Sequence, residues 1–378
     1  MFDLIIKNAI CVLPSEISHA DVGILNGKFH QIGNLKLASA KEVVDAKGLH
    51  LLPGLIDTQV HFREPGLIHK EDLEHGSKGA ALGGVTTFFE MPNTIPTTCS
   101  AELLAWKVTR AIETSHVDFS FFIGGTAQNF QDLSTLEKLP GCAGVKIFMG
   151  SSTGSLLVDD EDVLKKILQN GNRRMASHCE DEKMLVRDLY LRTYPVHHHP
   201  IWRSVEAALS ATTKLVELSK RYKRPIHVLH VSSKEEMQFL HKFKKPYATV
   251  EVTPQHLSFN AETIYDTLEN FAQMNPPIRN ENHRLALWKG VENGTVDVIG
   301  SDHAPHTFEE KSHPYPESHS GMPGVQTILP VMLTHVAEKK LSLQKMVKLT
   351  SENHAKIYKI KNKGKIAEGF DADCVLVD

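Results

Sequence analysis

Runs of apolar and β-branched residues recur along the middle of the chain and alternate with segments of helical periodicity. Eight of these runs are predicted strands: Leu51–Val60, Val85–Glu90, Val117–Ile123, Gly144–Phe148, Met175–Ser177, Ile226–His230, Thr249–Val252 and Val296–Gly300. Helical patterns occupy most of the intervals, as at Ala101–Thr114, Asp160–Gln169, Val205–Tyr222 and Lys234–Phe243. Eight strands that alternate with helices predict an α/β fold of the (β/α)8, or TIM, barrel type.

An open, doubly wound sheet is the main alternative for a chain in which strands and helices alternate. Its dinucleotide-binding form carries Gly-x-Gly-x-x-Gly between an early strand and the next helix. This chain has no such motif after its early strands. The interval between the runs at 249 and 296 is also long, as insertions near an active site often are, so we favour the barrel.

The two ends of the chain have a different pattern, in which short alternating runs are separated by turn residues. The runs Asp3–Cys11, Ala20–Leu25 and Phe29–Ile32 are broken by Asn-Gly and Gly-Asn pairs that favour hairpins. The last segment, Gly364–Asp378, ends in another short β-rich run. We therefore predict a small β-sandwich domain from residues 1–52 plus 345–378, and a barrel from residues 53–344.

Polar residues follow the predicted strands at the points where each strand ends. After the first strand they occupy every second position, and so share one face of an extended chain, at Asp57, Gln59, His61 and Arg63. The later strands carry Lys146, His178, His230 and Asp302, the last followed by His303 and His306. Because the carboxyl ends of barrel strands meet on one face, we expect these side chains to lie together.

The residue types in this set suit a metal-dependent hydrolase. Imidazole and carboxylate groups are the ligands that zinc and related ions prefer. Burial of Lys146 would lower the pKa of its amine, and a neutral amine can add carbon dioxide to become a carboxylate-like ligand. Such a metal would activate water for attack on a carbonyl group, and Asp302 could carry the proton to the leaving nitrogen.

Each of these residues has an ordinary structural explanation when it is considered alone. A single histidine is more often a hydrogen-bonded core residue, Lys146 could be ion-paired, and Asp302 could cap a helix. Their joint occurrence at the strand ends of one barrel favours a metal centre. We leave His227 as structural, because it faces away from His230, and we expect the run at 197–199 to lie on the surface.

Composition narrows the function classes further. The chain has 378 residues, 41% of them hydrophobic, and a formal net charge of −3, so nothing favours binding to nucleic acid or to a membrane surface. No apolar run has the length of a membrane span, and the five cysteines form no paired motif. With no leader pattern at the N-terminus, we expect a cytoplasmic enzyme that acts on a small molecule.

Longer motifs around these positions resemble the dihydroorotase family of the amidohydrolase superfamily. The segments that carry the resemblance are His61-Phe-Arg63-Glu-Pro-Gly, Met91-Pro-Asn93-Thr, Val145-Lys146-Ile-Phe-Met-Gly, Ser177-His178-Cys-Glu, His230-Val-Ser-Ser, Asn275-Pro-Pro-Ile-Arg and Asp302-His-Ala-Pro-His306. They span nearly the whole chain. The first and the last two, taken together, are the most specific.

The resemblance implies a role for each of these residues. It implies one or two zinc ions per chain, with Lys146 carboxylated and bridging, and His61, His178, His230 and Asp302 as the other ligands. It implies that Asp302 is also the catalytic base, and that the substrate is bound by Arg63, Asn93, Asn275 and His306. The reaction would be the reversible interconversion of dihydroorotate and N-carbamoyl-aspartate in pyrimidine biosynthesis, in an enzyme expected to be a homodimer.

The chain departs from the family pattern at two places. The family has histidine at the position of Gln59, and an amide oxygen is a weaker zinc ligand, so Gln59 is a doubtful member of the set. Relatives also continue beyond the position of Asp378, so we expect the small domain to be incomplete at its C-terminal end. The first departure makes the number of metals an open question.

Two other functions remain open at this point. The same metal residues would serve another ring amidase, such as an allantoinase, a hydantoinase or a dihydropyrimidinase. Arg63 and Asn93 favour a substrate that bears a carboxylate, which dihydroorotate has and those rings need not have. Gln59 and the short C-terminus would also suit a non-catalytic homologue that acts as a scaffold subunit.

Overall fold

A barrel of eight parallel strands dominates the computed structural model, which describes residues 1–151 and 156–378. Its strands are β6 (Leu55–Val60), β7 (Val85–Glu90), β8 (Asp118–Gly124), β9 (Cys142–Phe148), β10 (Met175–His178), β11 (Ile226–Val228), β12 (Ala248–Val252) and β13 (Val298–Ile299). A parallel bridge between Val60 and His303 joins the last strand to the first, with His61 N donating to His303 O at 2.8 Å. The predicted barrel is therefore confirmed.

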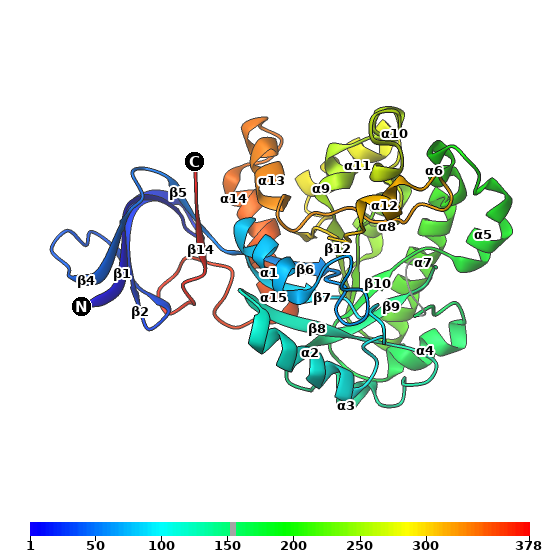
Figure 1. Cartoon of the computed structure of the whole chain (residues 1–378), viewed down its shortest axis with the longest axis horizontal. Coiled ribbons are helices and arrows are strands. Elements are labelled where there is room, and N and C mark those ends of the chain that lie inside the picture. The colour runs from blue at the N-terminus through cyan, green and yellow to red at the C-terminus, as the bar shows by residue number, and fades with distance from the viewer. Residues whose placement is uncertain (152–155) are drawn as a thin grey trace.

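Helices surround the barrel on its outer face (Figure 1). They are α1 (Leu73–Leu82), α2 (Ala101–Thr114), α3 (Leu133–Leu136), α4 (Glu161–Gln169), α5 (Glu182–Arg187), α6 (His199–Trp202), α7 (Val205–Tyr222), α8 (Lys234–Phe243), α9 (Pro254–Ser258), α10 (Ala261–Leu268), α11 (Glu281–Glu292), α12 (Phe308–Ser312), α13 (Ile328–Ala337), α14 (Leu343–Val347) and α15 (Asn353–Tyr358). Short turns of other helix types are η1 (Leu189–Leu191), η2 (Val196–His198), η3 (Glu269–Ala272) and η4 (Lys348–Glu352).

Local sequence signals explain where several of these helices begin and which face they bury. In α4 the Asp160 side chain accepts from backbone N–H groups of the first turn, and the buried residues Leu164, Ile167 and Leu168 follow the helical period. In α8 Ser233 and Glu236 form a capping box. These helices match their predicted ranges closely because capping and periodicity act locally.

The predicted strand Leu51–Val60 is two strands in the structure. Its first part, β5 (His50–Pro53), pairs with strands of the small sheet, and its second part is β6 of the barrel. Gly54 lies at the junction, where a Cβ atom would come within 2.1 Å of Thr86 Oγ1. The close approach of these two segments requires glycine, and the chain changes sheets there.

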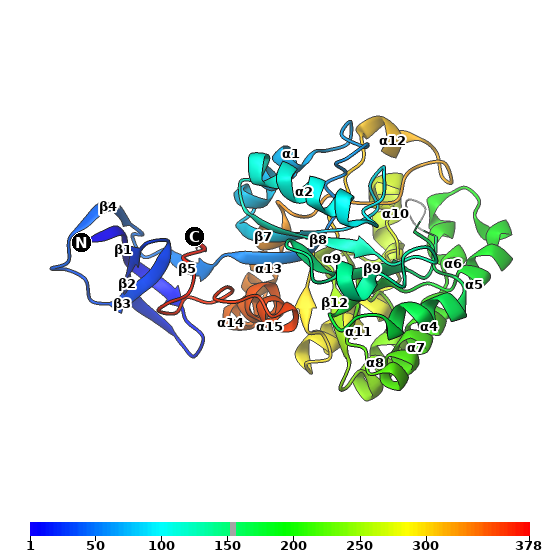
Figure 2. The same ribbon diagram turned by 90° about the horizontal axis from the view of Figure 1, so that it is seen from below.

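The two ends of the chain share a six-stranded sheet beside the barrel (Figure 2). Its strands are β5, β1 (Phe2–Val12), β2 (Ile17–Leu25), β3 (Lys28–Gly33), β4 (Ala40–Asp45) and β14 (Cys374–Val377). β14 pairs antiparallel with β5, which brings the last residues back to the first fifty. The sheet has its own apolar core, built around Ile6, Val22, Phe29 and Leu51. A small β-unit from both chain ends is thus confirmed.

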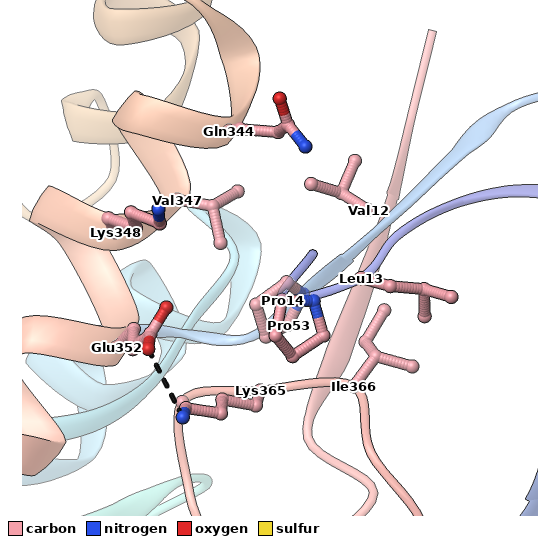
Figure 3. A pocket seen from close by; sticks show the side chains of 11 residues that line it. Val12, Leu13, Pro14, Pro53, Gln344, Val347, Lys348, Glu352, Lys365 and Ile366 are labelled. Carbon is pink, nitrogen blue, oxygen red and sulfur yellow. Dashed lines mark ion pairs between the residues drawn. The ribbon is translucent and has the colours of Figure 1, made fainter. Parts of the chain in front are cut away.

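A pocket lies between this sheet and the helices that follow the barrel (Figure 3). Val12 and Pro53 from the sheet face Val347 at the end of α14, and Lys365 forms an ion pair of 3.1 Å with Glu352. Helix α15 and η4, which lie within the range 345–378, contact β6 of the barrel. The division of the chain at residues 52 and 345 stays a prediction.

In the part of the chain that the structure describes, no helix is both long enough and apolar enough to cross a bilayer.

Candidate metal and substrate site

One cavity at the carboxyl ends of the barrel strands gathers most of the predicted site residues. It is lined by Gln59, His61, Lys146, Phe148, His178, His230, Asn275, Asp302, Ala304, Ser320 and Gly321. Five different barrel strands or strand ends contribute the six residues proposed as metal ligands. The structure therefore brings together side chains that lie up to 243 positions apart.

Three residues of this region have backbone angles that amino acids other than glycine rarely adopt. The φ angles are 64° at Arg63, 37° at His230 and 47° at Asp302. Each follows closely after a barrel strand, at the point where the chain turns away from the barrel axis. Such strain persists where surrounding contacts impose it, and it clusters at functional sites.

His61 is oriented with one ring nitrogen toward the cavity. Its Nδ1–H donates to Asn93 Oδ1 at 2.7 Å, so Nε2 carries the lone pair. That Nε2 lies 3.4 Å from Asp302 Oδ1. Burial lowers the pKa of His61, which keeps the ring neutral. A lone pair and a carboxylate oxygen that face each other repel, and a cation between or beside them would relieve that repulsion.

Gln59 is tied to the same carboxylate. Its Nε2 donates to Asp302 Oδ1 at 2.8 Å, while its Oε1 is buried without a hydrogen-bond partner. Asp57, two residues earlier, accepts from Ser301 N at 3.1 Å, so it joins the first and last strands and does not line the cavity. The unpartnered amide oxygen of Gln59 is the one atom of this side chain that could contact a cation.

His178 and His230 are a second pair of side chains that line the cavity. His178 Nε2 donates to Glu180 Oε2 at 2.8 Å, which leaves the lone pair on Nδ1. That Nδ1 lies 3.1 Å from His230 Nε2. Two nitrogens bound to one tetrahedral zinc at about 2.0–2.1 Å are separated by about 3.3 Å, so these rings need little movement to share an ion.

Glu180 orients His178 through the hydrogen bond to its Nε2. Its carboxylate is fully buried and pairs with Arg203, and that guanidinium together with His178 holds the pKa of Glu180 down at about 2 despite burial. A carboxylate that stays ionised fixes the His178 tautomer and makes the ring a better metal ligand. Glu180 was not predicted, although its position two residues after His178 places both on one face of an extended chain.

Lys146 lies on β9 with its amine in the cavity. The side chain is buried, and its Nζ lies 4.4 Å from the centre of the Phe148 ring. Burial lowers the pKa of Lys146 to about 7. Its positive charge also lowers the pKa values of His61, His178 and His230. A large share of the Lys146 amine is therefore neutral near pH 7, and the neutral amine is the reactive form.

The side chains in this cavity form a complete set of metal ligands only if Lys146 is one of the ligands. Among the residues that the structure describes, no three His, Cys, Asp or Glu side chains converge on one point. The cavity instead holds two pairs, His61 with Asp302 and His178 with His230. Lys146 lines the same cavity as both pairs, so a carboxylated Lys146 would complete each set.

The predicted substrate residues divide between two places next to the cavity. Arg63 Nη2 lies 3.3 Å from His306 Nε2, and Arg63 Nε donates to Pro305 O at 3.1 Å. Burial lowers the pKa of Arg63 to about 10, so the guanidinium is charged at neutral pH. Asn93 contacts His61, and Asn275 lies in the cavity wall. A charged guanidinium held in a buried position suits a ligand carboxylate.

His199 is a correction to the sequence analysis. The run at 197–199 was expected on the surface, and His197 is exposed, but His199 is buried beside Asn275. Its Nε2 lies 3.0 Å from both Met274 O and Asn275 Oδ1. No sequence signal separates it from its two neighbours, because only the packing of α6 against the segment at 274 buries it.

Comparisons with known proteins agree with this geometry. A family model described as Dihydro-orotase-like matches residues 48–184, and one described as Amidohydrolase family matches residues 202–378. The protein named Dihydroorotase in Methanosarcina acetivorans is 37% identical over all of this chain and 84% of its own length. The one in Methanosphaera stadtmanae is 35% identical over all of this chain and 87% of its own length.

The chain belongs to the dihydroorotase family. Solved structures with the same architecture come from related ring amidases. An L-hydantoinase (dihydropyrimidinase) from Arthrobacter aurescens aligns with a TM-score of 0.92 and 28% identity, over 98% of this chain and 86% of that one. A dihydropyrimidinase from Brevibacillus agri aligns with a TM-score of 0.90 and 26% identity, over 98% and 85%.

Membership of the dihydroorotase family confirms three of the expectations. The comparisons agree with the family resemblance and with the barrel and its small β-unit. They also agree with the predicted class of enzyme, which is a hydrolase of cyclic amides. The scaffold alternative gains no support from them. The roles of individual site residues, the metal and its number stay predictions.

Proposed function

We propose that this chain is a zinc-dependent dihydroorotase that opens and closes the ring amide between dihydroorotate and N-carbamoyl-L-aspartate in pyrimidine biosynthesis. The observation that carries the proposal is the buried, charged guanidinium of Arg63 beside His306, at the edge of a cavity built of metal-ligating side chains. The relatives named Dihydroorotase support this substrate. The expected homodimer and the cytoplasmic location remain predictions.

Lys146 is the residue that we propose to prepare the site. Its neutral amine adds carbon dioxide, forming an N–C bond and releasing a proton, and the resulting carbamate carries a negative charge. His61, Asp302, His178 and His230 line the same cavity, and together with the carbamate they would hold zinc. Zinc bound there would polarise the ring carbonyl and lower the pKa of the attacking water.

The chain's own residues would bind the substrate and move one proton. Arg63, Asn93, Asn275 and His306 hold the carboxylate and the ring. The Asp302 carboxylate takes a proton from water as the oxygen adds to the ring carbonyl carbon. Asp302 then gives that proton to the ring nitrogen as the C–N bond breaks, and ring closure follows the same path in reverse.

Substrate choice tests the proposal directly. Purified protein with zinc present is expected to hydrolyse dihydroorotate, and to do so far better than hydantoin or dihydrouracil, which lack the carboxylate. Arg63→Met should lower kcat/KM for dihydroorotate about 100-fold, because a buried charge pair is lost. Activity on neutral rings alone, unaffected by Arg63→Met, would identify a hydantoinase or dihydropyrimidinase instead.

Replacement of Lys146 tests the carbamate. Lys146→Ala is expected to lose bound zinc and activity together, since both pairs of ligands lose their shared carboxylate. A short carboxylic acid added to the variant should restore part of each. Zinc content measured by elemental analysis provides the readout beside activity. A Lys146→Ala protein with full zinc and full turnover would rule the carbamate out.

Gln59 decides how many metals are held tightly. The wild-type chain is expected to retain about one zinc after dialysis, and Gln59→His about two, because imidazole binds zinc more strongly than an amide oxygen. Gln59→Asn, which keeps an amide, serves as the control and should not gain a metal. Two tightly held zinc ions in the wild type would contradict this assignment.

Asp302 separates proton transfer from metal binding. Asp302→Asn is expected to keep at least one zinc while kcat falls by about 100-fold or more, because an amide cannot carry the proton. Turnover is measured alongside the zinc content of the same sample. Turnover close to that of the wild type would place the base on another residue.

A further inference from the structure

A chain of polar contacts links His306, which lies 3.3 Å from Arg63, to Lys70 and to Glu310 of α12. Lys70 Nζ lies 3.1 Å from His306 Nδ1 and 3.1 Å from Glu310 Oε1. Glu310 is itself held in place by a capping box with Thr307 at the start of α12. The side chains of Lys70 and His306 are only 7% and 1% exposed, so these contacts are protected from water.

The contacts of His306 restrict which ring nitrogen carries the proton. An ammonium group has three donors and no acceptor, so Nδ1 must accept from Lys70. His306 Nε2 lies 3.1 Å from the carbonyl oxygen of Ser320, which can only accept. Lys70 and Ser320 therefore require a neutral ring with its proton on Nε2, and only the longer contact from Arg63 Nη2, at 3.3 Å, would suit a lone pair there. Burial and the nearby cations Arg63 and Lys70 also lower the pKa of His306, which disfavours the doubly protonated form.

The tautomer of His306 with its proton on Nδ1 fits the neighbouring groups poorly. A proton on His306 Nδ1 would face Glu310 Oε2 at 3.6 Å, which is too long for a hydrogen bond, and it would face the Lys70 ammonium at 3.1 Å. It would also leave the Nε2 lone pair against the carbonyl oxygen of Ser320. The ion pair between Lys70 and Glu310 keeps the lysine charged, so Lys70 cannot become the acceptor.

This tautomer has a consequence for Arg63. With its proton on Nε2, His306 donates to the carbonyl oxygen of Ser320 and has no lone pair there for Arg63 Nη2, a donor 3.3 Å away. Two donors cannot hydrogen-bond to each other, so this tautomer leaves the Arg63 Nη2–H for an acceptor on a ligand. A carboxylate offers two oxygens on one plane and matches two adjacent donors. Ser320, whose carbonyl now accepts from His306, lines the cavity next to this position.

We propose that Lys70 is a positioning residue that fixes the His306 tautomer, so that His306 cannot accept from Arg63 and the Arg63 guanidinium keeps its donors for the carboxylate of the substrate. Lys70 itself touches neither the substrate nor the metal ligands. Its effect passes through Nδ1 to Nε2 of one ring. The part of this inference that concerns substrate affinity rests on the proposed function, whereas the tautomer does not.

Nuclear magnetic resonance tests the tautomer without any reaction. In protein labelled with ¹⁵N-histidine, the His306 signals are assigned by their loss in His306→Gln. The wild type is expected to show a protonated Nε2 and an unprotonated Nδ1. Lys70→Met should shift His306 toward the other tautomer or a mixture, and Lys70→Arg, which keeps a donor, should restore the wild-type pattern. A wild-type proton on Nδ1 would overturn the proposal, with no variant needed.

Steady-state kinetics tests the consequence for binding. Lys70→Met should raise the KM for dihydroorotate about tenfold and leave kcat within about twofold, because a lone pair on His306 Nε2 would then compete with the substrate carboxylate for Arg63 Nη2. Lys70→Arg should recover most of the affinity. Lys78→Met is the matched control, since it breaks an exposed lysine–glutamate pair with Glu74 on α1 and should change nothing.

The two experiments separate the two hypotheses. A wild-type protein that fails to hydrolyse dihydroorotate would remove the proposed function, while the tautomer of His306 would still be measured. An unchanged tautomer and an unchanged KM in Lys70→Met would remove the role of Lys70, while the dihydroorotase activity would stand.

Discussion

The seam that closes the barrel is the constraint on which the site depends. β6 and the segment after β13 meet through the bridge between Val60 and His303. This contact places His61, one residue after Val60, next to Asp302, one residue before His303. Without it the two halves of one ligand pair would be separated by the full width of an open sheet. Asp57, which accepts from Ser301 N, strengthens the same seam from within the barrel.

Burial of polar groups gives the site its chemistry. Desolvation lowers the pKa of Lys146 to about 7 and keeps the histidines around it neutral. The same low-dielectric surroundings make uncompensated lone pairs costly, so the cavity favours a cation. The Glu180 carboxylate, which contacts His178 from outside the cavity, stays ionised because the Arg203 guanidinium pairs with it. The orientation of the proposed metal ligands therefore depends on residues that contact these ligands from outside the cavity.

The substrate side of the cavity follows the same principle. Arg63 supplies the charge, but the proton on His306 depends on Lys70, and the position of Lys70 depends on Glu310 at the start of α12. Gln59 belongs to the proposed ligand set itself. Its amide nitrogen donates to Asp302, and its amide oxygen would be a weaker zinc ligand than an imidazole nitrogen.

The sequence by itself determined the barrel, the small β-unit and the strand ends that carry the chemistry. Those features depend on local periodicity, capping and motifs, as the match of α2, α7 and α8 to their predicted ranges illustrates. Only the tertiary structure decided which side chains touch. Three examples are contacts between residues that lie 75 to 243 positions apart. They are the contact of His199 with Met274, the hydrogen bond from Gln59 to Asp302 and the contact of Lys70 with His306. No local pattern encodes such contacts, because they arise when the barrel closes and its loops pack over it.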